Sequence, residues 1–315
     1  DRQGHFCFFF DIAHRVTSEN RPRAEVSFTS QCLYNVGIMS VHNEHLLKYP
    51  RTPHLQGSRL QAGDDGSDQT PYTDLQGQYI VIEEKMDGAN AGFSFTEGGE
   101  LRLQSRGHYL VGGGRESQFG LFKSWATAHQ DAFLDRFEDR YLVFGEWMYA
   151  KHTVYYNQLP HLFLEFDIYD KAKGMFLSTQ ARRALCDGLP IASVPVLYEG
   201  VAPKHYRDVL GLIGRSTAKT ATWEDDLVRA AVASGAEPTR VQQQTLMHDG
   251  MEGLYIKVET STETTGRYKF VRRDFLQAIL DGDGHHAQRM LVPNRLDPSV
   301  DIFASHNSWN ESPTP

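Results

Sequence analysis

No hydrophobic run in this sequence is long enough to cross a membrane. The apolar stretch FCFFF at residues 6–10 is far shorter than the ~20 residues that a spanning helix requires. It also lacks the basic flank and the cleavage site of a secretory signal peptide. We therefore expect a soluble protein without a membrane partner.

Cysteine is scarce, with three residues, Cys7, Cys32 and Cys186, in a chain of 315. They are too far apart for a Cys-x-x-Cys metal clip, and so few cysteines in a long chain argue against a disulfide framework. The expected compartment is a reducing one, with the cytoplasm as the default.

A positive net charge is also lacking, because the formal charge is -8 at pH 7. The protein as a whole therefore does not attract nucleic acid, and such a partner must be bound by a local basic surface. The stretch GRYKFVRRDF at residues 266–275 is the candidate for that surface.

The first 38 residues have an unusual composition, since the first lysine of the chain is Lys48. The chain does not begin with methionine, whereas MSVHNEHLLKYPRTPHL from Met39 reads like a natural start. Two interpretations stay open: residues 1–38 are an extension outside the fold, or residues 24–39 form one or two strands. We expect the main domain over residues 39–275 and a short helical or flexible tail over residues 276–315.

Short apolar or alternating segments predict strands, and segments with a helical period of apolar residues lie between them. Strands are expected at 79–85, 91–96, 100–106, 141–149, 162–170, 252–259 and 266–272. Helices are expected at 118–137, 178–189, 205–214, 222–235 with Thr222 as N-cap, and 272–284, and a surface loop at 57–74. Strand pairs separated by helices without regular alternation indicate an α+β fold built on antiparallel sheet.

Lys85 lies in VIEEKMDGANAGFSF, residues 81–95, next to the turn-forming pair Asp87-Gly88. One interpretation is an exposed lysine at a hairpin turn. The other is a nucleophile, because a neutral amine attacks well once nearby cations or burial lower its pKa. Lys257 and Lys269, each in a strand-like segment, are the candidate cations.

Nucleotidyl transfer to a lysine also needs carboxylates for a divalent metal, since the charge of the triphosphate must be neutralised. Glu146 and Glu252 stand at predicted strand ends, and Phe166 could stack on a purine. Taken singly, the two acids could equally be solvated side chains and Phe166 a core residue. Lys269, Arg272 and Arg273 could likewise form a solvated charged face.

Six short motifs occur in the order found in covalent nucleotidyltransferases: EKMDGAN (84–90), SRG (105–107), FGEW (144–147), LEFDIYD (164–170), EGLYIK (252–257) and RYKFVR (267–272). The set resembles motifs I, Ia, III, IIIa, IV and V of polynucleotide ligases and capping enzymes. It is most similar to the ATP-dependent RNA ligases of the phage T4 RNA ligase 2 and editing ligase type. Asn90 supports this branch, because DNA ligases typically carry arginine at that position.

The resemblance implies a nucleotidyltransferase (ATP-grasp-like, adenylation) domain with antiparallel sheets flanked by helices. It implies that Lys85 becomes adenylylated by ATP, that Glu84 lies near the adenine edge and that Phe166 stacks on adenine. Asn90 and Arg106 would contact the ribose or the 5'-phosphate end.

The remaining implied roles concern metal, phosphate and nucleic acid. Glu146 would contact the ribose or a metal-bound water, and Glu252 would organise Mg²⁺ or Mn²⁺. Lys257 and Lys269 would hold the α-phosphate and favour the neutral form of Lys85. RNA with nicked or broken ends, as in RNA repair, would bind Arg106 and a basic set of Arg267, Arg272 and Arg273.

The sequence departs from the family at motif V and after it. Arg267 stands where these ligases usually have the first lysine of Lys-x-Lys, which puts its role in doubt. Only 46 residues follow Lys269 (315 minus 269), fewer than the roughly 70 that a five-stranded barrel needs. We therefore expect no C-terminal OB domain.

The segment GLIGRSTAKT, residues 211–220, superficially resembles a phosphate-binding loop. Ala218 stands where the glycine before Lys219 should be, so we do not assign that function. The alternatives to an RNA ligase are a DNA ligase, a GTP-dependent capping guanylyltransferase, and a non-catalytic nucleotide-binding module. Intact Lys85, Glu252, Lys257 and Lys269 argue against the last of these.

Overall fold

The structure is a computed structural model that describes residues 46–60, 69–275 and 291–304. The chain divides into two compact units, Asp1–Glu44 and His45–Pro315. The first unit, and with it the proposed extension over residues 1–38, lies outside the described residues. All of the described residues belong to the second unit.

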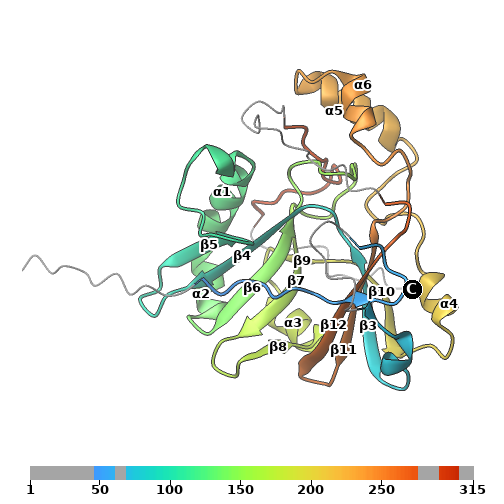
Figure 1. Ribbon diagram of the computed structural model, residues 1–315. Coiled ribbons are helices and arrows are strands. Elements are labelled where there is room, and N and C mark those ends of the chain that lie inside the picture. Colours follow the sequence, from blue (N-terminus) through green and yellow to red (C-terminus); the bar gives the residue numbers. More distant parts are fainter. Residues whose placement is uncertain (1–45, 61–68, 276–290, 305–315) are drawn as a thin grey trace, which may run out of the picture. The chain divides into compact units, whose positions relative to one another are not determined.

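The centre of the second unit is a sheet whose main path runs β10-β3-β11-β12-β8-β7-β6-β4-β5 (Figure 1). Neighbours along this path are antiparallel. The strands are β1 (His54–Leu55), β2 (Gln69–Thr70), β3 (Tyr79–Lys85), β4 (Ala89–Phe95), β5 (Leu101–Ser105), β6 (Tyr141–Trp147), β7 (Phe163–Asp170), β8 (Met175–Leu177), β9 (Ala192–Ser193), β10 (Val196–Val201), β11 (Gly253–Glu259) and β12 (Glu263–Val271).

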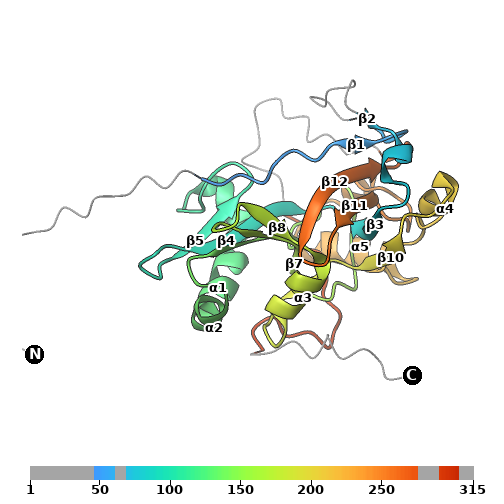
Figure 2. The same ribbon diagram turned by 90° about the horizontal axis from the view of Figure 1, so that it is seen from below.

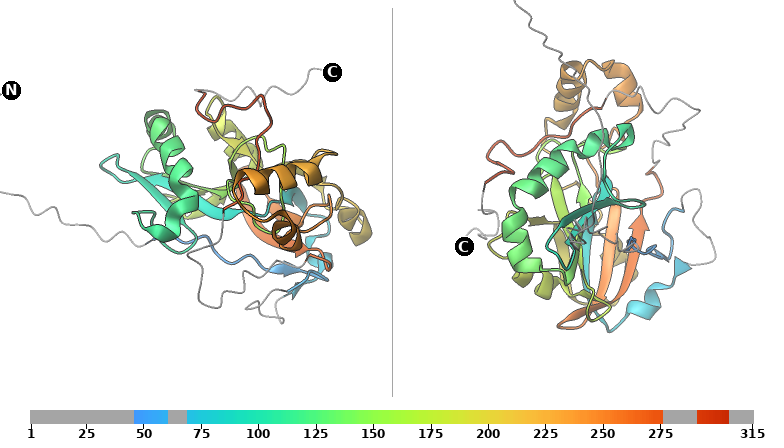
Figure 3. Two further views of the ribbon diagram at one scale, coloured as in Figure 1. Left: turned by 90° about the horizontal axis from the view of Figure 1, so that it is seen from above. Right: turned by 90° about the vertical axis from the view of Figure 1, so that its left-hand side faces the viewer.

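Helices cover one side of this sheet, and the segment with residues 46–60 crosses the other side (Figures 2 and 3). The helices on the first side are α1, α2 and α3, whereas α5 and α6 lie at the upper right of Figure 1. The 3-10 helices are η1 (Tyr72–Leu75) and η2 (Gly114–Phe119), and the α-helices are α1 (Gly120–Ala128), α2 (Gln130–Phe137), α3 (Thr179–Cys186), α4 (Tyr206–Leu210), α5 (Trp223–Ala233) and α6 (Pro238–Gln243).

Separate apolar clusters hold the parts of the sheet. One buries the aromatic residues of α1 and α2 against β4, β6 and β7, and includes Phe93, Trp125 and Phe163. Another lies around β3, β11 and α4, with Ile82 and Leu254 at its centre. The two clusters fix the two arms of the sheet, one containing β3 and β11 and the other β6 and β7, on either side of the β12–β8 pairing.

The strand predictions agree closely with the structure, and β3 coincides with the predicted segment 79–85. The expectation of several sheets is wrong, because one hydrogen-bonded network connects every described strand. The expected surface loop at 57–74 is also interrupted, since β2 and most of η1 fall within it.

Two helix predictions need correction. The single helix expected at 118–137 is broken at His129, which has φ -110° and ψ 9° and separates α1 from α2. Thr222 occupies the N-cap position of α5, but its side chain accepts no hydrogen bond from the helix. Its hydroxyl instead donates to Asp226 at 3.2 Å.

Part of the predicted tail packs against the domain. Residues 291–304 include buried Val292, Asn294 and Ile302, and bridges join Ala150 to Pro293 and Leu159 to Leu296. The expected helix at 272–284 lies mostly outside the described residues, and its described part up to residue 275 is not helical. Within the described ranges, no helix has the length and apolar character that crossing a bilayer requires.

Candidate active site

A cavity of about 420 Å³ lies between the two arms of the sheet. Most of the residues singled out in the sequence line it, although they come from segments far apart in the chain. These residues are Glu84, Lys85, Asn90, Arg106, Glu146, Phe166, Glu252 and Lys269. The remaining candidates, Lys257, Arg267, Arg272 and Arg273, are not among the lining residues.

Strand register brings Lys85 to Glu252. Antiparallel pairing of β3 with β11 places Lys85 opposite Gly253, so that the preceding residue, Glu252, reaches the lysine amine. The Lys85 Nζ lies 2.8 Å from the Glu252 carboxylate. Gly253 also permits the close approach of β12 on the other side of β11, because a Cβ there would meet the Phe270 carbonyl oxygen at 1.9 Å.

Asp87 anchors the turn that follows Lys85. The Asp87 carboxylate accepts hydrogen bonds from the backbone N–H groups of Thr153 and Val154, each at 2.7 Å. The next residue, Gly88, donates its N–H to Glu146 at 3.1 Å, and a Cβ on it would meet the Trp147 carbonyl oxygen at 2.7 Å. The Asp-Gly pair therefore fixes the turn against β6 instead of forming a free hairpin tip.

Acids outnumber bases around Lys85. Burial lowers the pKa of Lys85, but the carboxylates of Glu252, Glu146 and Asp87 outweigh burial and raise the pKa above its ordinary value. The expectation that nearby lysines lower this pKa is therefore wrong for this structure. Burial raises the pKa values of Glu146 and Glu252 to about 7, and the Asp87 carboxylate adds to the rise at both, so the site holds more negative charge than it can stabilise alone.

This surplus of buried negative charge fits a divalent cation. Glu146 and Glu252 offer carboxylate oxygens, the ligand type that Mg²⁺ prefers, and Mg²⁺ commonly takes only one or two protein carboxylates together with substrate phosphates. Among residues 46–60, 69–275 and 291–304, no three His, Cys, Asp or Glu side chains form a ready-made metal cluster. The two acids would therefore need further ligands from a substrate or from water.

One wall of the cavity is aromatic. A β-bulge between β6 and β7 pairs Phe144 with Asp167 but Gly145 with Glu165, so that Phe166 is the extra residue. Bulges redirect a side chain, and Phe166 lines the cavity. Its ring lies 5.1 Å from that of Tyr49 and 6.3 Å from that of Tyr255.

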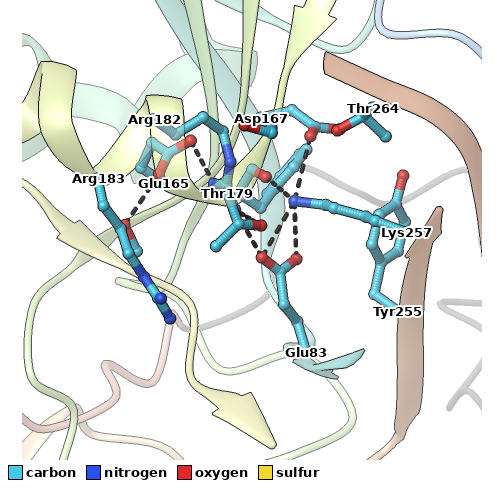
Figure 4. A network of polar contacts seen from close by, with 12 residues as sticks. Glu83, Glu165, Asp167, Thr179, Arg182, Arg183, Tyr255, Lys257 and Thr264 are labelled. Carbon is cyan, nitrogen blue, oxygen red and sulfur yellow. Dashed lines mark hydrogen bonds and ion pairs between the residues drawn. The ribbon is translucent and has the colours of Figure 1, made fainter. Parts of the chain in front are cut away.

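Beneath the cavity lies a buried charge network (Figure 4). Arg182 of α3 bonds Glu165 at 2.6 Å and Glu83 at 2.7 Å. Lys257 of β11 pairs with Glu83 at 2.9 Å and with Asp167 at 3.1 Å, and it donates to the Phe166 carbonyl. The network connects β3 and β11 of one arm to β7 of the other.

Lys257 and the three arginines from 267 to 273 differ in their surroundings. Lys257 is fully buried, and Arg267 lies between Tyr49 and the ring of Phe176, whose centroid is 3.7 Å from its guanidinium. The Arg272 side chain is 10% exposed and pairs with Asp274 at 2.9 Å. Arg273, by contrast, is exposed.

The cavity rim carries polar groups suited to a nucleotide. Arg106, directly after β5, is exposed and lines the cavity. The Asn90 side-chain oxygen is buried and has no hydrogen-bond partner among the described residues. Lys269 of β12 lies opposite Tyr255 in the register, and its charge lowers the pKa of Glu252, although burial dominates.

The motif-bearing part of the chain, residues 78–271, matches the sequence model of one family, RNA ligase. The chain belongs to the RNA ligase family. The search of curated protein sequences found no match to this chain.

The solved structures to which this chain is similar include RNA ligase mutants from Naegleria gruberi. One mutant with ATP and Mn is 16% identical, with a TM-score of 0.43, over 71% of this chain and 60% of that one. Another mutant, in its apo form, is 17% identical, with a TM-score of 0.43, over 71% and 61% of the two chains. The present chain thus covers less than two thirds of these ligases.

Sequence reasoning missed several residues of this RNA ligase family member. Tyr49, Tyr255 and His152 also line the cavity. Tyr255 could have been found, because alternation along β11 places it on the same face as Lys257. Tyr49 gave no periodic signal, and its position depends on hydrogen bonds to Asp167 and to Tyr255.

Proposed function

We propose that this chain is an ATP-dependent RNA ligase that joins a 3'-hydroxyl to a 5'-phosphate through a lysyl-AMP intermediate. The observation that carries the proposal is the Lys85–Glu252 contact at 2.8 Å in a cavity lined by nearly every nucleotide-contacting residue that the family resemblance implies. Membership of the RNA ligase family supports the choice of RNA over DNA.

In the first step, the Lys85 Nζ attacks the α-phosphorus of ATP, a P–N bond forms, and the bond to pyrophosphate breaks. The lysine must first lose a proton, and the Glu252 carboxylate, hydrogen-bonded to Nζ, is positioned to receive it. Phe166 and its aromatic neighbours would hold the purine, and the unpartnered Asn90 oxygen suits a ribose hydroxyl.

Glu146 and Glu252 would hold Mg²⁺ or Mn²⁺, which when bound neutralises phosphate charge and weakens the carboxylate field that keeps Lys85 protonated. Lys269, on the cavity wall, would then be the protein cation nearest the phosphates. Lys257 acts differently from the expectation: it holds the strands below the cavity, because its amine is engaged by Glu83 and Asp167.

In the second step, an oxygen of the RNA 5'-phosphate attacks the phosphorus of lysyl-AMP, the P–N bond breaks, and Lys85 takes up a proton. In the third step, the 3'-hydroxyl attacks the activated 5'-phosphate, loses its proton, and AMP leaves. Arg106 at the exposed rim suits the incoming 5'-phosphate, because a guanidinium binds phosphate with two parallel hydrogen bonds.

Incubation with α-labelled ATP and Mg²⁺, followed by denaturing electrophoresis, tests the first step. The protein should become labelled through an acid-labile, base-stable bond, and Lys85→Ala should abolish the label without unfolding the chain. Labelling from GTP in preference to ATP would indicate a capping enzyme, and undiminished labelling of Lys85→Ala would remove the lysine from the mechanism.

A sealing assay tests the substrate. A nick with ribonucleotides on its 3'-hydroxyl side should be joined faster than an all-DNA nick. Equal rates on the two nicks would contradict the RNA assignment even if lysine labelling were observed.

A further inference from the structure

The segment that superficially resembles a phosphate-binding loop makes a different set of contacts. Residues 214–220, here named the clamp loop, lie beside the end of β3 and bind Glu84, the residue directly before Lys85. The Glu84 carboxylate accepts hydrogen bonds from the Ser216 hydroxyl at 2.6 Å, the Thr217 N–H at 3.0 Å and the Thr217 hydroxyl at 2.7 Å. Both carboxylate oxygens are thus engaged by this loop.

The other side of the clamp loop is fastened to the segment that leads into Glu252. Ser216 N–H donates to the Asp249 carbonyl at 2.9 Å, and Met251 N–H donates to the Gly214 carbonyl at 3.0 Å. Buried Lys219 donates to the His248 carbonyl at 2.7 Å. Residues 248–251 end directly before Glu252, so the loop joins the residue before the nucleophile to the residues before its carboxylate partner.

This connection is placed where the β-ladder ends. Gly253 opposite Lys85 is the last pair between β11 and β3, and beyond that point the Glu252 carbonyl accepts a hydrogen bond from the Arg272 N–H at 3.1 Å instead of pairing with β3. A carboxylate that accepts several hydrogen bonds holds its neighbours firmly, because such charge-assisted bonds are stronger than neutral ones. Glu84 is 1% exposed, so water competes little for these bonds.

We propose that Ser216 and Thr217 are positioning residues for lysine adenylylation: by binding Glu84 they fix the Lys85 amine against Glu252. The inference rests on the proposed function and extends it to a loop outside the family motifs. It also gives Glu84 a second role beside the one that the resemblance implies. Ser216 and Thr217 donate three hydrogen bonds to its carboxylate, so Glu84 anchors the loop as well as lining the cavity.

Thr217→Val is the first test, because valine keeps the shape and removes only the hydroxyl, and Thr217 is exposed so that the fold tolerates the change. In single-turnover labelling with α-labelled ATP and Mg²⁺, the rate constant at saturating ATP should fall about tenfold, as expected for loss of a hydrogen bond to a charged group. The ATP concentration for half-maximal rate should stay unchanged, and Thr217→Ser should restore the rate. Thr239→Val, at an exposed site in α6, is the matched control.

A double-mutant cycle with Glu84→Gln supplies the second test. If both side chains act through one contact, the combined variant should be little slower than the slower single variant, because coupled residues are non-additive. Three results would overturn the inference: a wild-type rate for Thr217→Val, an effect confined to ATP affinity, or additive losses in the cycle. Absence of labelling in the wild-type protein would instead refute the proposed function itself, so the two failures are distinguishable.

Discussion

Replacing Lys257 by methionine separates two roles for this lysine. Its amine is fully buried and contacts the carboxylates of Glu83 and Asp167 at 2.9 and 3.1 Å, as well as the Phe166 carbonyl. Removing one partner from a buried ionic network costs on the order of 3–5 kcal/mol, because the opposite charges stay buried without compensation. Arg182 still pairs with Glu83, so we expect the lower end of that range.

Urea unfolding followed by tryptophan fluorescence measures this loss. With the usual urea dependence of the unfolding free energy, a loss of about 3 kcal/mol lowers the midpoint by about 1 M or more. Lys269→Met is the control, because Lys269 is only half-buried on the cavity wall, and it should reduce lysine labelling with a much smaller loss of stability. An unchanged midpoint for Lys257→Met, together with lost labelling, would refute the reasoning and return Lys257 to a phosphate-binding role.

Three further predictions concern charge. Glu252→Gln keeps the side-chain shape but should lose most lysine labelling, since an amide cannot compensate metal charge; a wild-type labelling rate would show that the carboxylate charge is dispensable. Arg273→Ala should weaken sealing of a 5'-phosphorylated RNA nick and reduce the slope of log binding constant against log salt concentration by about one unit. Arg272→Ala should chiefly lower the thermal midpoint of unfolding. The reverse pattern would contradict the inference drawn from the different exposures of the two arginines. Burial lowers the pKa of His161 to about 4. The unfolding free energy that depends on neutral His161, on the order of 3 kcal/mol, is therefore present above pH 6.5 and is lost as pH falls from 6.5 to 4. His161→Phe should flatten the dependence of the unfolding free energy on pH in that window, and an equal slope in both proteins would count against this.

The strands that carry the motifs could be predicted because each has a local signal. In β3, an apolar run ends at a charged residue and is followed by Asp-Gly, and the structure gives the same limits, Tyr79–Lys85. By contrast, β10 was missed, because an edge strand without a fully buried residue shows little apolar periodicity.

The break between α1 and α2 could not be predicted from periodicity. The buried side chains of Trp125, Phe133 and Phe137 keep a regular spacing through it, which favours one continuous helix. His129, where the helix breaks, instead makes a hydrogen bond at 3.1 Å to the carbonyl of Ile302. That partner is 173 residues away, and no local pattern contains it.

The buried arginine of α3 could not be predicted from its own segment either. The buried face of this helix consists of Thr179, Arg182 and Cys186, and any pattern that counts arginine as a surface residue places that face in solvent. Arg182 is buried because Glu83 and Glu165, from two distant strands, meet its guanidinium. Such complementarity exists only between segments, so a segment examined alone cannot indicate it.

The candidate cations of the site also differ in whether protein acids surround them or they line the cavity. The sequence motifs place Lys85, Lys257 and Lys269 around the α-phosphate and Arg267 at the nucleic acid. In the structure, Lys257 and Arg267 lie among carboxylates and rings below the cavity, whereas Lys85 and Lys269 line it. Below the cavity the acids are matched by bases, but around Lys85 they are in excess. The charges below the cavity are therefore balanced by the protein alone. Around Lys85 they are not, so the binding of a cation and a nucleotide is expected to alter the protonation of the lysine and its neighbouring acids.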